Sequence, residues 1–73
     1  MNKTPSGLDD RIYEAIMRNI PHYKSVTYDE LVTKTATSLG NSHPEEKIRE
    51  TIERLLDRFI LLEDNKGNIT LNE

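Results

Sequence analysis

Apolar side chains recur along this chain at helical spacing in three stretches, and short apolar runs follow the third stretch. The spacing of about three to four residues predicts helices over residues 8–20, 28–39 and 44–58. Two short apolar runs, residues 60–62 and 69–71, then flank a polar turn, which indicates a β-hairpin. The chain therefore reads as three helices followed by a hairpin.

The predicted core consists of the residues on the inner faces of these helices. They are Leu8, Ile12, Tyr13, Ala15, Ile16, Met17, Ile20, Tyr28, Leu31, Val32, Thr35, Leu39, Ile48, Ile52, Leu55, Leu56 and Phe59.

Polar residues at the predicted helix ends support these boundaries. A side chain that accepts a hydrogen bond from the first turn, followed three residues later by an acidic one, forms a capping box. Three such pairs occur: Ser6 with Asp9, Thr27 with Glu30, and Ser42 with Glu45. Pro21 is expected to end the first helix, and Gly40 is expected to end the second in a left-handed conformation.

The turn of the predicted hairpin contains Asn65, Gly67 and Asn68, which tolerate positive φ. Two strands alone are marginally stable, so the pattern favours one further short strand near Val26 that pairs with the hairpin. The expected organisation is a flexible tail over residues 1–5 and a single domain over residues 6–73. The fold class is α+β, mainly α.

This order of elements resembles the winged helix-turn-helix superfamily over about residues 8–72. The resemblance implies a three-helix winged helix with a C-terminal β-hairpin wing and a short strand near Val26. Such domains dock onto nucleic acid or protein. It rests on the capping box Thr27 to Glu30, on the spacing Ile48, Ile52, Leu55 and Leu56, and on residues 59–63 with Ile69.

A finer resemblance is to the C-terminal winged helix of cullins, carried by residues 15–18, 30–32 and 52–58. In that family a lysine receives a ubiquitin-like modifier, and this sequence has Arg18 at the matching position. The tyrosine-rich end of that family is also missing here. The resemblance implies that acidic winged helices can serve assemblies of proteins.

The composition of the chain makes some classes of binding partner unfavourable. The chain has 73 residues, no cysteine and a formal net charge of −3, with 32% charged residues. This balance gives no general attraction to phosphate backbones or anionic lipid. No apolar run approaches the roughly 20 residues of a membrane span, so we expect an intracellular protein, in cytoplasm or nucleus, with no membrane partner.

The exposed side of the third predicted helix carries two stripes of opposite charge. Electrostatic steering towards a complementary protein is the function that such stripes favour. Two ion pairs are expected along them, Glu50 with Arg54 and Arg49 with Glu53. The predicted protein-binding residues are Glu46, Glu50, Glu53, Asp57, Arg54 and Arg58, and Lys47 extends the basic stripe.

Duplex DNA is the alternative partner, with helix 44–58 in the major groove and the hairpin on a neighbouring phosphate. The cations available for it are Lys34, Lys47, Arg49, Arg54 and Lys66. Base reading usually depends on arginine, lysine, asparagine or glutamine, whereas the exposed start of this helix also carries Glu45, Glu46 and Glu50. The acidic residues therefore oppose a function that the fold would otherwise allow.

Catalysis is not expected. His22 and His43 have no neighbours at metal-ligand spacing, no phosphate-binding glycine loop occurs, and no cofactor is predicted. Tyr13 and Tyr28 lie on apolar stripes, whereas Tyr23 lies in a predicted loop and is a candidate for an exposed contact.

Overall fold

A computed structural model describes residues 4–21 and 24–72 of the chain. Within them lie three helices and a three-stranded antiparallel sheet in a winged-helix-like layout, so the predicted α+β, mainly α, fold class is confirmed. In chain order the elements are α1 (Asp10–Asn19), β1 (Val26–Thr27), α2 (Tyr28–Ser38), α3 (Glu45–Asp57), β2 (Leu61–Glu63) and β3 (Asn68–Leu71).

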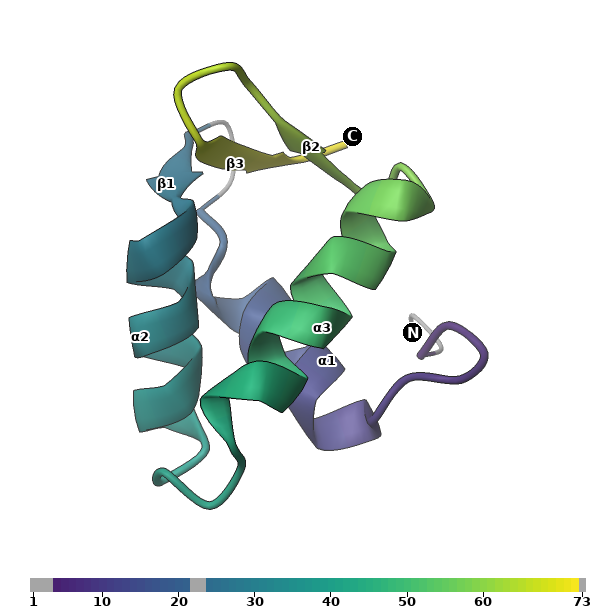
Figure 1. Ribbon diagram of the computed structural model, residues 1–73, viewed down its shortest axis with the longest axis vertical. Helices are drawn as coiled ribbons and strands as arrows, with labels where there is room; N and C mark the ends of the chain where they lie inside the picture. Colours follow the sequence, from purple (N-terminus) through teal and green to yellow (C-terminus); the bar gives the residue numbers. More distant parts are fainter. Residues whose placement is uncertain (1–3, 22–23, 73) are drawn as a thin grey trace.

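The sheet covers one end of the helical layer, above the start of α2 and the end of α3 (Figure 1). Its strand order is β1-β3-β2, so the first strand pairs with the last. Val26 lies opposite Ile69, which confirms the short strand expected near Val26. The amide of Tyr28 also donates to the Gly67 carbonyl at 3.0 Å, which joins the hairpin turn to the first residue of α2.

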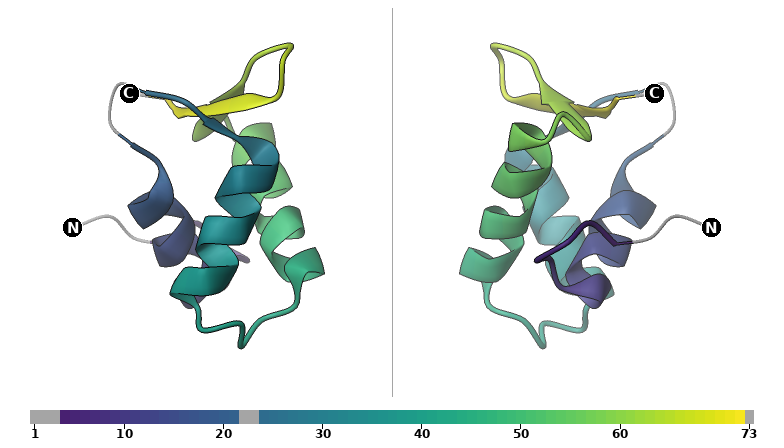
Figure 2. Two further views of the ribbon diagram at one scale, coloured as in Figure 1. Left: turned by 90° about the vertical axis from the view of Figure 1, so that its left-hand side faces the viewer. Right: turned by 90° about the vertical axis from the view of Figure 1, so that its right-hand side faces the viewer.

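The core lies between the three helices and the inner face of the sheet (Figure 2). Most of the predicted core residues are buried there, because their helical spacing places them on one face of each helix. Leu8, Met17, Tyr28, Leu39 and Leu56 are only partly buried and pack against the edge of the core.

The first helix begins later than predicted. Asp9, and not Ser6, is its N-cap: one Asp9 carboxylate oxygen accepts from the amides of Arg11 at 2.9 Å and Ile12 at 3.2 Å. Leu8 therefore precedes the helix, and its amide donates to the Pro5 carbonyl at 3.3 Å. The residue predicted as the capping-box partner of Ser6 is itself the cap, and its carboxylate satisfies two amides at once.

The second helix begins at Tyr28, as predicted, and ends at Ser38, one residue before the predicted end. The Thr27 hydroxyl accepts from the Glu30 amide at 3.2 Å. The Glu30 carboxylate lies 3.9 Å from the Lys34 ammonium group. Gly40 has φ 64° and Asn41 has φ 57°, so two successive left-handed residues turn the chain towards α3.

The predicted cap of the third helix is wrong. Pro44 occupies the N-cap position and provides no side-chain hydrogen bond. Ser42 instead donates its hydroxyl to the Leu39 carbonyl at 2.7 Å, which stabilises the end of α2. The prediction failed because a serine near a helix end can also serve the helix before it.

The predicted position of Phe59 in the core is also wrong. Helix α3 ends at Asp57, and the Phe59 side chain is 70% exposed. The Phe59 amide donates to the Leu56 carbonyl at 3.1 Å and the Ile60 amide to the Leu55 carbonyl at 3.0 Å. These two bonds form a Schellman motif, whose left-handed residue is Phe59 with φ 58°. The left-handed turn removes this side chain from the helical stripe.

The hairpin turn is organised by an aspartate. The Asp64 carboxylate accepts from the amides of Lys66 at 2.8 Å and Asn68 at 2.9 Å, and from the Asn68 side-chain amide at 3.0 Å. These hydrogen bonds hold the pKa of Asp64 below its ordinary value. Gly67, with φ 83°, supplies the positive φ that the turn residues predicted.

Candidate docking surface

Four acidic side chains form the outermost line of α3, directed away from the core. Glu46, Glu50, Glu53 and Asp57 are all exposed, and their spacing of four, three and four residues places them along one side of the helix. Glu50 is paired with Arg54 at 3.3 Å, as predicted. We call these four residues the acidic stripe.

The Arg49 guanidinium interacts with two carboxylates and an aromatic ring of the same domain. Its guanidinium lies 3.2 Å from the Glu45 carboxylate and 3.6 Å from that of Asp29. It also lies over the Tyr28 ring, 5.5 Å from the ring centre, where a cation is attracted by the aromatic face. The predicted pair between Arg49 and Glu53 is replaced by these contacts, which join α3 to the start of α2.

Tyr28 belongs to the same contact between α2 and α3. Its hydroxyl donates to the Arg49 carbonyl at 3.4 Å. Burial, together with the neighbouring Glu53 carboxylate, raises the pKa of Tyr28 to about 12. The phenol is therefore a hydrogen-bond donor at neutral pH. Its hydrogen bond joins the start of α2 to the backbone of α3.

The residues proposed for DNA binding lie on three different elements. Lys34, on α2, is 3.9 Å from Glu30, and Arg54 is paired with Glu50. Lys47, on α3, and Lys66, in the hairpin turn, have no ion pair within 4.0 Å in the described part of the chain. The hairpin turn and the start of α3 lie at opposite ends of the molecule (Figure 1), so these two cations do not form one patch.

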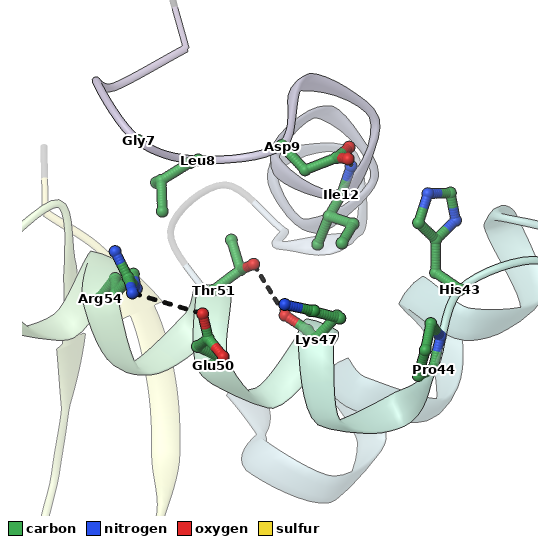
Figure 3. A pocket seen from close by; sticks show the side chains of 10 residues that line it. All are labelled: Gly7, Leu8, Asp9, Ile12, His43, Pro44, Lys47, Glu50, Thr51 and Arg54. Carbon is green, nitrogen blue, oxygen red and sulfur yellow. Dashed lines mark hydrogen bonds and ion pairs between the residues drawn. The ribbon is translucent and has the colours of Figure 1, made fainter.

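The basic stripe of α3 faces the segment that precedes α1. The Arg58 guanidinium donates to the Ser6 carbonyl at 2.8 Å. Beside it, Lys47 and Arg54 line an open groove of about 400 Å³ between α3 and residues 7–12, with Leu8 and Ile12 as apolar lining (Figure 3).

Charges of both signs line this groove. Asp9 and Glu50 line it together with the two cations, and each already has a partner, Asp9 as the cap of α1 and Glu50 in its pair with Arg54. The groove therefore presents no surplus of one charge to a ligand.

Residues 4–21 and 24–72 contain no cluster of three or more His, Cys, Asp or Glu side chains that could hold a metal ion. His43 has its Nδ1 2.9 Å from the Ser42 hydroxyl, so its ring belongs to the turn between α2 and α3. Tyr23, the predicted exposed contact, and His22 lie outside the described residues. In the described part of the chain, no helix is long and apolar enough to cross a membrane.

Two exposed apolar side chains were not predicted as functional. Phe59 is 70% exposed and Leu62 is 42% exposed, the two large apolar residues of the described chain on its surface. Leu62 could have been found from strand alternation, because Leu61 is its buried neighbour. The exposure of Phe59 could not be predicted in this way, because its position in the sequence continues the helical spacing of the core residues.

Comparison of the chain with protein-family models, with curated proteins and with solved structures returns no match.

Proposed function

We propose that this chain is a non-enzymatic docking module that binds a protein partner through the exposed side of α3, inside the cell. Assemblies for transcription, replication or protein turnover are the setting that a winged-helix-like layout suggests. One observation carries the proposal. Two arginines of α3 are engaged by neighbouring carboxylates, Arg49 by Glu45 and Asp29 and Arg54 by Glu50, whereas the outermost line of the helix is acidic.

This arrangement favours protein over DNA for a physical reason. A guanidinium that reads a base must first leave its intramolecular carboxylates, and those carboxylates then face the phosphates of the duplex. The same acidic stripe attracts a basic protein surface at long range and opposes wrong partners. The pair between Arg49 and Asp29 and the bond from the Tyr28 hydroxyl to the Arg49 carbonyl also join α3 to α2, which favours a preorganised surface.

Duplex DNA remains the second candidate, because the hairpin stands beside α3 and because Lys47 and Lys66 carry no ion pair in the described part of the chain. An amide-resolved NMR titration with duplex DNA separates the two functions. Protein docking predicts that shifts are absent or vanish at physiological salt. Shifts on residues 43–54 and 64–68 that persist at physiological salt would make DNA the target.

Charge reversal tests the protein-docking surface directly. Glu50→Lys combined with Asp57→Lys is expected to remove the partner from a pull-down while the thermal unfolding midpoint stays close to that of the wild type. Glu14→Lys is the control, because Glu14 is an exposed acid on α1, away from the acidic stripe. A partner retained by the double variant, or lost equally with Glu14→Lys, would contradict docking through α3.

A further inference from the structure

Phe59 combines two properties that are unusual for a phenylalanine. Its side chain is 70% exposed, and its backbone is left-handed with φ 58°. Glycine or asparagine usually occupies this position of a Schellman motif, because a Cβ atom is disfavoured there and a bulky side chain more so. Asn41 is the other non-glycine residue with positive φ in the described chain, and its residue type tolerates this conformation.

The surrounding backbone holds Phe59 in this conformation. Its amide donates to Leu56, and its carbonyl accepts from the Asn72 side chain at 2.6 Å. The Asn72 amide donates to the Ile60 carbonyl at 3.1 Å, so the end of β3 ties the same turn from the other side. Disfavoured backbone conformations persist where the neighbouring structure determines them, and they concentrate at functional sites. The ring is thus displayed at a fixed point between α3 and β2.

A second exposed apolar side chain stands nearby in the chain. Leu62, on β2, is 42% exposed and follows Phe59 by three residues, so the two Cα atoms are at most about 11 Å apart. A partner segment of a few extended residues spans this distance.

Three of the charged residues that flank this pair in the sequence are acidic. Asp57 ends the acidic stripe two residues before Phe59, and Glu63 and Asp64 follow Leu62, all of them exposed. The cation next to Phe59, Arg58, directs its guanidinium to the Ser6 carbonyl. The apolar pair is therefore flanked by carboxylates along the chain on both sides.

We propose that Phe59 and Leu62 form the apolar centre of the docking surface, and that its occupant is a segment of another protein that carries lysine or arginine beside a bulky apolar side chain. This rests on the proposed function and adds the chemistry of the partner. An aromatic centre inside a charged rim is the usual composition of a binding hot spot. The carboxylates oppose nucleic acid, and a second copy of the chain would place the same carboxylates against each other.

The test is a selection of random displayed peptides on the wild-type protein. Peptides that combine lysine or arginine with a bulky apolar residue are expected to be enriched. Their affinity, measured by calorimetry, should fall at least about tenfold in both Phe59→Gly and Phe59→Ala. It should also fall when the rim is reversed by Asp57→Lys. No enrichment, enrichment without basic residues, or unchanged affinity in the Phe59 variants would overturn the inference.

The unfolding midpoints of the Phe59 variants show whether a loss of affinity comes from the missing ring or from a destabilised fold. Phe59→Gly relieves the disfavoured conformation, so its unfolding midpoint should rise by about 4 °C or more, whereas Phe59→Ala keeps the Cβ atom and should stay near the wild type. A lower midpoint for Phe59→Gly would show that the ring supports the fold, and would overturn the inference. If the peptides lose affinity with Glu50→Lys and keep it in both Phe59 variants, docking through α3 stands and the role of Phe59 fails. If neither change affects affinity, both proposals fail.

Discussion

Thr35 provides the sharpest test of the core. Its side chain is 0% exposed, and its hydroxyl oxygen has no hydrogen-bond partner in the part of the chain that the structure describes. A buried hydroxyl without a partner costs roughly 1–3 kcal/mol. Thr35→Val replaces the hydroxyl by a methyl group of similar shape. It should therefore remove most of this cost and raise the free energy of unfolding.

For a domain of this size, 1 kcal/mol corresponds to about 4–8 °C in the unfolding midpoint. Thr35→Val is therefore expected to raise the midpoint by at least about 4 °C in a thermal melt followed by circular dichroism. Thr51→Val is the matched control. Thr51 is also buried, at 5% exposure, but its hydroxyl donates to the Lys47 carbonyl at 2.8 Å. The same substitution there removes a hydrogen bond, worth roughly 1 kcal/mol, and should leave the midpoint unchanged or lower.

The comparison between the two valine variants would refute the reasoning in either of two ways. If Thr35→Val melts at or below the wild-type temperature, the Thr35 hydroxyl has a partner in solution. If both variants gain the same stability, the added methyl group and not the orphaned oxygen explains the gain.

Two further predictions concern the helix start and the hairpin turn. Asp9→Ala should lower the free energy of unfolding by about 1 kcal/mol in denaturant titration, whereas Ser6→Ala should change it by less than about 0.5 kcal/mol; the reverse order would restore Ser6 as the cap of α1. Asp64→Asn should lower the unfolding midpoint at about pH 7, and the deficit should shrink towards about pH 2. The lowered pKa of Asp64 stabilises the fold above the ordinary value of 3.8, and this stabilisation is lost as the pH falls through the folded-state pKa. A deficit that stays constant with pH would show that the charge of Asp64 is not involved.

The fold was predictable because its signals are local and repeated. Ile48, Ile52 and Leu55 lie on one face of α3 by spacing alone, and all three are fully buried. The strand at Val26 followed from the marginal stability of a two-stranded hairpin. Helix ends were less predictable, because more than one polar residue near a helix start can act as its N-cap, as Ser6 and Asp9 could before α1.

The candidate surface was only half predictable. The acidic stripe followed from helical spacing, but the engagement of Arg49 did not, because Asp29 lies 20 positions away in the sequence and comes near only when α2 packs on α3. Phe59 was misplaced for a different reason. A left-handed residue ends the helical periodicity at the position it occupies, and a sequence gives no sign of that when the residue is not glycine.

The bond between Asn72 and the Phe59 carbonyl has a consequence for anything attached to this domain. A tag, a linker or a second domain joined after Asn72 starts close to the Phe59 turn, since the Asn72 side chain donates to the Phe59 carbonyl. A tethered segment has an effective concentration in the millimolar range when its linker is short and flexible. An apolar, basic extension fused there would therefore compete for the surface from within the same molecule.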